Sequence, residues 1–275
     1  MNVSMQELRH LRNYESVRSK AEEATIEINR YVEKNFARRA TWQWVKDVLG
    51  QTGTVLKMAL ILKQKEDGNV KRHIILDMRG SLGNARARAD ERTVLPRLTD
   101  VTHMLQDMWK PRGGDKGRRE SRDDDDFEFY LIDLEDAFCH FPVRKEELRH
   151  CVTPDEHDQE ALVWTATLFG YKCAPLIVGR LSSALGRLLQ SLLSPEETQL
   201  QVYVDDVLIA ALGGRALREK RLALLLYTAA AFVVRISMKK GERGRRITWI
   251  GCVIGPGGAD GKTGSHRPQH LQKHG

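Results

Sequence analysis

The chain has 275 residues, of which 41% are hydrophobic, and a formal net charge of +7 with pI ≈ 9.3. This composition excludes an intrinsically disordered chain and allows one large or two modest domains. The charge suits a polyanionic partner, although a charge of this size can also serve solubility alone. No apolar run reaches the ~18 residues of a membrane span, and the N-terminus lacks a signal-peptide pattern. We therefore expect an intracellular protein, cytoplasmic or nuclear, with no membrane partner.

The cysteines lie at positions 139, 151, 173 and 252, and no pair has a spacing typical of redox or zinc motifs. Two neighbouring pairs, Cys139-His140 and His150-Cys151, also match no standard zinc pattern. We therefore predict reduced thiols, as in an intracellular compartment, and no zinc site.

Residues 1–53 are predicted to form a charged, mainly helical N-terminal extension. Ser4 and Glu7 have the spacing of a capping box. A short helix is predicted over Thr41–Leu49, ended by Gly50. Trp42 and Trp44 are expected to be core anchors. The apolar face of this helix is expected to consist of Trp42, Val45, Val48 and Leu49.

Two strands, Thr54–Lys63 and Val70–Asp77, are predicted to form a hairpin around an Asp67-Gly68 turn. Cations near the tip of such a hairpin can bind the triphosphate of a nucleotide. The alternative is a solvent-exposed edge that lysines protect from further pairing. The basic and titratable side chains concerned are Lys63, Lys65, Lys71, Arg72 and His73.

After a predicted helix over Leu98–Trp109, the sequence becomes highly charged and of low complexity from residue 111 to residue 126. Four consecutive aspartates, Asp123 to Asp126, could suggest a metal site. An acidic run of this kind is more typical of a flexible loop. We therefore expect residues 111–126 to be a charged, flexible insertion.

Two β-rich runs contain closely spaced aspartates. Phe127–Phe138 includes Asp133 and Asp136, and Gln201–Ala210 has Asp205-Asp206 at its centre. Because aspartate favours turns over strand interiors, the second run is predicted to be a hairpin with both aspartates at its tip. A neighbouring strand would bring Asp133 opposite Asp205.

Three such carboxylates would suit hard divalent cations and two-metal phosphoryl transfer. The alternative for the Asp205-Asp206 pair is an ordinary exposed turn. The alternative for Asp136 is a turn cap or a partner for a basic side chain.

The C-terminal half is predicted to contain helices over Ala174–Leu193 and Arg215–Ala231 and strands over Val233–Met238 and Ile247–Ile254. The coarse order predicts an α+β sheet with helices on one face. The first helix has Pro175 in its first turn. Its expected apolar face consists of Leu176, Ile177, Val178, Leu181, Leu185, Leu188, Leu189 and Leu192.

A basic cluster lies between residues 235 and 246, and it indicates either phosphate contact or a solvated loop. Its members are Arg235, Lys239, Lys240, Arg243, Arg245 and Arg246.

Several motifs in chain order resemble those of reverse transcriptases. Tyr203-Val204-Asp205-Asp206 is similar to the catalytic signature, and Asp133-Leu134-Glu135-Asp136-Ala137-Phe138 is similar to the first palm motif. Phe169 in place of a glutamine resembles the retrotransposon branch more than the retroviral one. The remaining matches are Lys71 to Asn84 with the fingers motif, Thr167 to Pro175 with the intervening motif, and Ile247 to Ile254 with the primer grip.

The resemblance implies an RNA-directed DNA polymerase that transfers nucleotides from dNTPs to a primer 3′-hydroxyl on an RNA or DNA template. It implies that Asp133, Asp205 and Asp206 hold two Mg²⁺ ions, for which Mn²⁺ could substitute. Phe138 would stack under the deoxyribose and block a 2′-hydroxyl; the alternative is a core residue. Lys239 or Lys240 would approach the leaving pyrophosphate, and Arg72 the triphosphate, although the usual arginine position falls on His73.

The implied dNTP-binding residues are therefore Lys63, Arg72, Asp136, Phe138, Gly170 and Lys239. The implied nucleic-acid-binding residues are Arg79, Lys172, Tyr203, Trp249 and Gly251. Gly170 and Lys172 precede a helix N-terminus, where backbone N–H groups favour phosphate.

The implied fold is the fingers and palm of a right-hand polymerase, an α+β structure with an antiparallel palm sheet packed on helices and no complete thumb. We expect residues 54–110 to be fingers-like, 127–254 palm-like with some fingers, and 255–275 a disordered tail. Without a thumb, the chain is expected to be a fragment or decayed piece of a Pol polyprotein, whose remainder would be a partner. The alternative function is an inactive, truncated retroelement remnant that only binds nucleic acid. An RNA-synthesising palm polymerase is disfavoured by Phe138.

Overall fold

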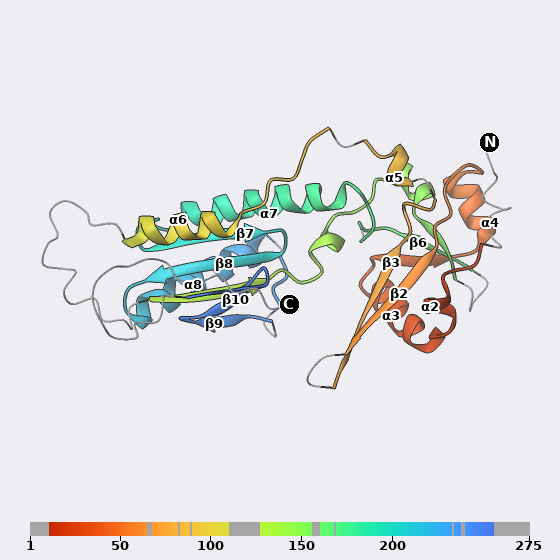
Figure 1. Cartoon of the computed structure of the whole chain (residues 1–275). Helices are drawn as coiled ribbons and strands as arrows, with labels where there is room; N and C mark the ends of the chain where they lie inside the picture. The colour runs from red at the N-terminus through yellow and green to blue at the C-terminus, as the bar shows by residue number, and fades with distance from the viewer. Residues whose placement is uncertain are drawn as a thin grey trace, which may run out of the picture. The chain divides into compact units, whose positions relative to one another are not determined.

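The computed structural model describes residues 11–64, 68–81, 83–88, 90–109, 127–155, 160–167, 169–232, 234–237 and 240–255 (Figure 1). The chain divides into two compact units. Unit 1 comprises Met1–Arg92 and Phe138–Ile177, and unit 2 comprises Thr93–Ala137 and Val178–Gly275. The predictions for the Ser4–Glu7 capping box, the 111–126 insertion and the tail beyond residue 255 lie outside the described residues. The expected domain boundaries stay predictions.

Unit 1 contains a two-stranded hairpin and a separate three-stranded antiparallel sheet of order β1-β6-β5. The hairpin pairs β2 (Met58–Gln64) with β3 (Val70–Leu76), as predicted, although β2 begins four residues after the predicted start at Thr54. The sheet was not predicted, and its central strand β6 contains the fully buried Trp164. The other elements are α2 (Glu15–Arg18), α3 (Ala21–Glu33), β1 (Ala37–Ala40), α4 (Trp42–Trp44), η1 (Val45–Leu49), α5 (Gly83–Arg86), η3 (Ala137–His140), η4 (Lys145–His150), β5 (Val152–Asp155) and β6 (Glu160–Trp164).

The helix predicted over Thr41–Leu49 is present as α4 followed by the π-helical η1. The Thr41 side chain caps it by accepting a hydrogen bond from the Trp44 N–H at 3.1 Å. Trp42 and Trp44 pack, partly buried, against a core cluster, as expected. Val48 was assigned to the apolar face wrongly, because it is 47% exposed. The wider π-helical turn alters the positions that share a face.

Unit 2 is built on a four-stranded antiparallel sheet of order β7-β8-β4-β9. The ranges predicted for α6 and α8 match the structure, and α7 ends two residues early. The elements are α6 (Leu98–Trp109), β4 (Phe127–Asp133), α7 (Ala174–Ser191), β7 (Thr198–Tyr203), β8 (Asp206–Leu212), α8 (Arg215–Ala231), β9 (Glu242–Gly244), β10 (Ile247–Trp249) and β11 (Cys252–Ile254).

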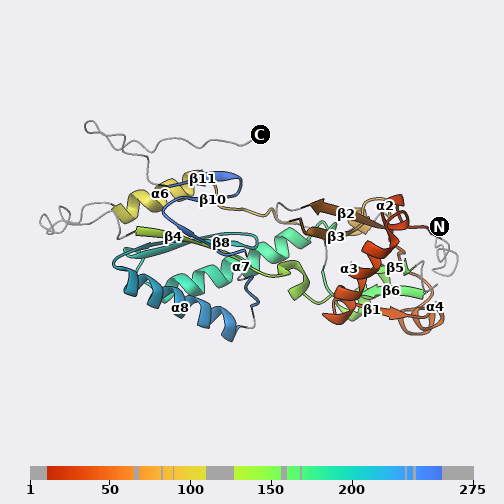
Figure 2. The same ribbon diagram turned by 90° about the horizontal axis from the view of Figure 1, so that it is seen from below.

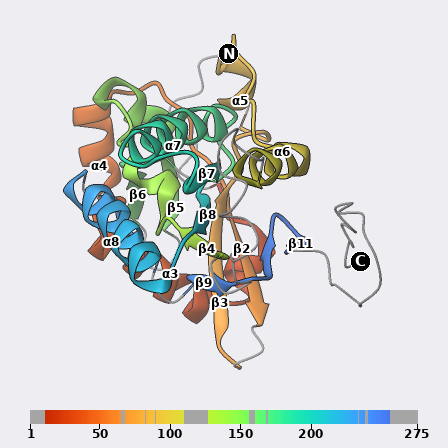
Figure 3. The same ribbon diagram turned by 90° about the vertical axis from the view of Figure 1, so that its left-hand side faces the viewer.

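Both faces of this sheet are covered, not one as predicted. Figure 2 shows α7 and α8 on one side of β4 and β8 and α6 on the other, and Figure 3 separates α6 from α8 in the same way. Alternate residues of β8 follow this division: Leu208 packs with the α6 cluster, whereas Val207 and Ile209 line a small cavity with α7 and α8. Two buried faces explain why β8 is a continuous apolar run rather than an alternating one.

Two further expectations for unit 2 were wrong, and one of its strands was not predicted. The segment predicted as a strand over Val233–Met238 contributes only a single bridge, between Ile236 and Leu134, in its described part. In the segment predicted as the helix Ala174–Leu193, Ile177 and Leu181 are 39% and 50% exposed, because α7 packs along a narrower stripe than its leucine content indicated. Leu192, which is 42% exposed, lies just beyond the end of α7. Strand β9 was not predicted, since its sequence Glu-Arg-Gly has no β signature.

Candidate active site

The β7–β8 hairpin brings the Asp205-Asp206 pair to one end of the palm-like sheet. Tyr203 pairs with Asp206, so Val204 and Asp205 form the turn and Asp206 is the first residue of β8. The predicted hairpin is confirmed, although only one of the two aspartates lies in the turn itself. Val204 has φ 55°, a left-handed conformation that is rare for a β-branched residue. Such strain costs roughly 1–3 kcal/mol and is typical of functional turns.

Strand β4 ends beside this turn and contributes the third carboxylate. Asp133 lies opposite Asp206 in the β4–β8 register, rather than opposite Asp205 as expected. The N–H of Leu134 donates to the Asp205 carbonyl oxygen at 2.9 Å, which fixes the end of β4 against the turn. Asp133, Asp205 and Asp206 therefore share one edge of the sheet, although they are far apart in sequence.

The electrostatics of this edge show concentrated negative charge. The pKa of Asp206 is raised to about 6, first by burial and then by the nearby Asp205 and Asp133 carboxylates, while Lys240 acts in the opposite direction. The Nζ of Lys240 lies 2.6 Å from both carboxylate oxygens of Asp133. Asp133 is only 8% exposed. Lys240 is therefore the counter-ion of Asp133 in this structure.

The chain segment that precedes Lys240 is attached to the same edge. The Ser237 N–H donates to the Asp133 carbonyl oxygen at 2.9 Å, and the Glu135 N–H donates to the Arg235 carbonyl oxygen at 2.8 Å. Lys239, the implied pyrophosphate-side lysine, lies outside the described residues. Its sequence alternative, Lys240, is the lysine that the structure places at the aspartates.

The donor set suits a hard divalent cation, because it consists of carboxylates whose mutual repulsion such an ion would relieve. Among the residues that the structure describes, no group of three or more acidic, histidine or cysteine side chains is placed so that it could hold a metal ion as it stands. The oxygens of Asp133 are directed to Lys240 instead. The residue types and their register fit a metal site, provided that Lys240 shifts when a cation binds.

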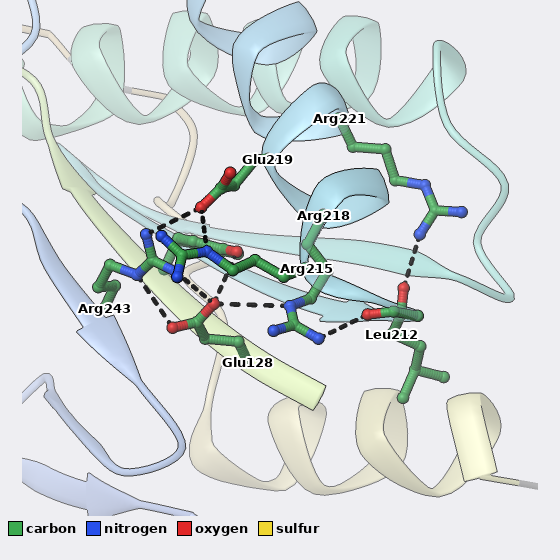
Figure 4. A network of polar contacts seen from close by, with 9 residues as sticks. Glu128, Leu212, Arg215, Arg218, Glu219, Arg221 and Arg243 are labelled. Atoms are coloured by element: carbon green, nitrogen blue, oxygen red, sulfur yellow. Dashed lines mark hydrogen bonds and ion pairs between the residues drawn. The ribbon is translucent and has the colours of Figure 1, made fainter. Parts of the chain in front are cut away.

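The basic cluster contains at least one residue with an internal role. Arg243 of β9 makes a two-pronged contact with Glu128 of β4, with N···O distances of 3.0 Å. Figure 4 shows that Glu128 also faces Arg218 of α8, and that Glu219 bridges Arg215 and Arg243. Arg243 is therefore paired within the protein, a role that neither alternative for the basic cluster, phosphate contact or a solvated loop, included.

The candidate nucleotide-binding residues of unit 1 lie on the β2–β3 hairpin. Lys63 is exposed and pairs in register with Lys71. Arg72 is bonded to Glu23 of α3, whereas the neighbouring His73 faces Phe169, with ring centroids 6.2 Å apart. Arg72 and His73 thus belong to different faces of the strand, as the period of a β-strand requires.

The turn before α7 is held tightly against the end of β3. Gly170 has φ 108°, and a Cβ at this position would lie 2.2 Å from the Leu76 carbonyl oxygen. Asn84 donates to the Gly170 carbonyl oxygen and accepts from the Lys172 N–H, both at 2.8 Å. Gly170 is therefore required by this packing, and Lys172 remains exposed beside the helix N-terminus. The motif contained Asn84, but only the structure reveals its bridging role.

The remaining candidates differ in accessibility. Arg79 is exposed, and Gly251 is exposed at the tip of the β10–β11 hairpin with φ 78°. Tyr203 is partly buried, with its ring centroid 6.1 Å from that of Trp249. Trp249 is 1% exposed and belongs to the core, so only its backbone could contact nucleic acid. Asp136 has φ 50° in the turn after β4.

Comparison with known proteins agrees with this architecture. The fold is that of the fingers and palm of a right-hand polymerase, with an antiparallel sheet packed on helices. A family model described as reverse transcriptase (RNA-dependent DNA polymerase) matches residues 76–254. The chain therefore belongs to the reverse transcriptase family. A search of curated proteins finds no match.

Solved structures of a foamy viral protease–reverse transcriptase are similar in fold. One complex with dsDNA has a TM-score of 0.61 and 17% identity, over 90% of this chain and 42% of that chain. Another, with an RNA/DNA hybrid, has a TM-score of 0.57 and 15% identity, over 90% of this chain and 27% of that chain. The chain thus spans less than half of these longer proteins. None of its described helices combines the length and apolarity that a membrane crossing requires.

Proposed function

We propose that this chain is an RNA-directed DNA polymerase domain that transfers nucleotides from dNTPs to a primer 3′-hydroxyl. The observation that supports this most is the meeting of Asp133, Asp205 and Asp206 at adjoining strand ends of one sheet. Metal-assisted phosphoryl transfer requires clustered carboxylates of this kind. The assignment to a retrotransposon Pol polyprotein goes with this proposal and rests on the motifs alone.

In this proposal Asp133 and Asp205 are the principal ligands of two Mg²⁺ ions, and Asp206 is a less direct one. When bound, the ions would lower the pKa of the primer hydroxyl and neutralise charge on the leaving phosphates. Lys240 would leave the Asp133 carboxylate as the cations enter, since both compete for the same oxygens. A lysine released there is free to contact the pyrophosphate, the role that the motif gives to Lys239 or Lys240.

The proposed substrate contacts follow the motif assignments residue by residue. Phe138 would exclude a 2′-hydroxyl by steric conflict, with Asp136 beside the same nucleotide. Lys63 and the backbone at Gly170 would contact its phosphates, and Arg72 could join them only by leaving Glu23. The template and primer are assigned to Arg79, Lys172, Tyr203 and Gly251, with Trp249 supporting Tyr203 from the core.

Nucleic acid partners are supported by the foamy viral structures, which were solved with dsDNA and with an RNA/DNA hybrid. The net charge of +7 is consistent with a polyanionic partner. An RNA template with a DNA primer is therefore the first substrate to test.

The test is primer extension on an RNA template with dNTPs and Mg²⁺, for wild type, Asp205→Asn and Asp47→Asn. Asp47 is an exposed aspartate of η1 and serves as the matched control. We expect extension by wild type and Asp47→Asn and at least a 100-fold loss in Asp205→Asn, in the range of other electrostatic catalytic groups. If folded wild type binds primer–template in a salt-sensitive manner but extends nothing, the chain is an inactive nucleic-acid-binding remnant.

A further inference from the structure

Three aromatic rings from distant parts of the sequence meet in unit 1. The ring centroid of Phe169 lies 4.6 Å from that of Phe138, with 42° between the planes, and 6.2 Å from that of His73, with 84° between the planes. These residues come from the turn before α7, from η3 and from β3. The distances and angles are those of favourable aromatic pairs.

This stack is at the surface rather than in the core. Phe169 is 42% exposed and Phe138 is partly buried, whereas the neighbours of Phe138, Ala137 and Cys139, are buried. The interpretation of Phe138 as a simple core residue therefore does not describe its environment. A partly exposed ring has room to change rotamer unless a second group restricts it.

The backbone that presents Phe169 is well fixed. The Leu76 N–H donates to the Phe169 carbonyl oxygen at 3.4 Å, and Gly170 packs directly on the Leu76 carbonyl. Asn84 holds the next turn through Gly170 and Lys172. The backbone at Phe169 is thus held in place, and its ring lies where it can restrain the ring of Phe138.

His73 completes the support from β3. Burial lowers the pKa of His73, and the charge of Lys71 acts in the same direction, which favours the neutral form of the ring. A neutral imidazole can pack edge-on against a phenyl ring without burying a charge.

We propose that Phe169 is a positioning residue for sugar selection, which holds the Phe138 ring where it excludes a 2′-hydroxyl. This inference rests on the proposed polymerase function. Steric exclusion is effective only if the blocking ring cannot move aside, and the stack with Phe169 supplies that restraint. Phe169 would therefore affect the choice between dNTP and rNTP through its contact with Phe138.

The test compares kcat/KM for single incorporation of a dNTP and the matching rNTP. Phe169→Leu removes the ring, and we expect it to lower the dNTP preference by about two-fold to ten-fold, the range of one aromatic pair. Phe169→Tyr keeps the ring and should retain the preference. Phe138→Ala should lower it further, and adding Phe169→Leu to Phe138→Ala should change nothing more. Phe232→Leu, at a 59% exposed phenylalanine of unit 2, is the control.

The outcomes separate this inference from the proposed function. If wild type extends primers and Phe138→Ala relaxes selection, but Phe169→Leu has the wild-type preference, the role of Phe169 is overturned and the polymerase stands. An additive loss in the double variant also overturns it, because the two rings would then act independently. If wild type incorporates no nucleotide, both proposals fail. Should Phe169→Leu not fold, Phe169→Met provides the same comparison, since it also lacks a ring.

Discussion

Asp206 shows how a single residue connects the candidate active site to the stability of the protein. Its carboxylate is partly buried next to Asp205 and Asp133, and its pKa is raised from 3.8 to about 6. A carboxyl group whose pKa is raised by folding contributes stability below its unfolded pKa and loses that contribution as the pH rises through the folded value. In the absence of a divalent cation, ionised Asp206 should therefore destabilise the fold near neutral pH.

We predict that Asp206→Asn is more stable than wild type at pH 8 in EDTA. The difference should be about 1 kcal/mol after allowance for solvent screening of a partly exposed carboxylate, and it should vanish near pH 4. Urea unfolding at each pH measures it, and Asp47→Asn shows the effect of the amide alone at an exposed position. Equal or lower stability of Asp206→Asn at pH 8 would show that Lys240 compensates the charge fully.

At the level of elements, strand β9 is held by side chains as much as by its backbone. Its Arg243 contacts Glu128 of β4, which also accepts a hydrogen bond from Tyr130 at 2.8 Å and faces Arg218 at 3.5 Å (Figure 4). The side chains of Glu128 and Arg218 are 13% and 8% exposed. Burial opposes ionisation of Glu128, but the hydrogen bonds from Arg243 and Tyr130 outweigh it and lower its pKa.

We predict that Glu128→Gln lowers the free energy of unfolding by about 3 kcal/mol, because it leaves the Arg218 charge buried without its counter-ion. Arg215→Gln, which breaks an exposed pair with Glu219, should lower it far less, because water screens such a pair. Denaturant unfolding measures both. The double variant Glu128→Gln/Arg218→Met should recover part of the loss. Strictly additive effects would mean that Glu128 and Arg218 do not interact.

The elements that could be predicted from the sequence are those with strong local patterns. The β2–β3 and β7–β8 hairpins have turn residues between apolar runs, so their presence was predicted, although β2 and β7 begin three or four residues from the predicted starts. The helices α6 and α8 have helical periodicity, and their ranges match. Strands β1 and β9 are short and polar, and β5 contains Pro154, so only pairing with distant strands makes them strands. The register between two strands also depends on tertiary structure. The sequence therefore predicted Asp133 opposite Asp205, whereas the structure places it opposite Asp206.

In the candidate site, too, the sequence predicted the features that are local in the chain and missed those that depend on distant residues. Motifs singled out the aspartates, Phe138 and Gly170 as candidates, because the chemistry or the backbone conformation that marks them is local in the sequence. The sequence did not predict the ion-pair partners of Arg72 and Arg243 or the burial of Trp249. Each of these depends on residues that are distant in sequence. Asn84 and Phe169 had no assigned role until the fold placed them against the turn and Phe138.

At the scale of the whole molecule, the chain forms two units from alternating segments, each with its own core. Trp164 is fully buried in the core of unit 1, and Trp249 is 1% exposed in that of unit 2. The chain passes between the units at residues 92, 137 and 177. Separate cores favour separate cooperative units of unfolding, even where the segments of one unit are discontinuous.

We predict that Trp164→Ala and Trp249→Ala each weaken mainly their own unit. Each should cost about 3–5 kcal/mol, a large part of the roughly 5–15 kcal/mol by which domains are stable. Hydrogen exchange followed by mass spectrometry should show faster exchange in β1 and β6 for Trp164→Ala, and in β4 and β8 for Trp249→Ala. Each variant is the control for the other. Equal loss of protection in both units would instead mean that the units unfold together, and that the stability of the candidate active site depends on the core of unit 1.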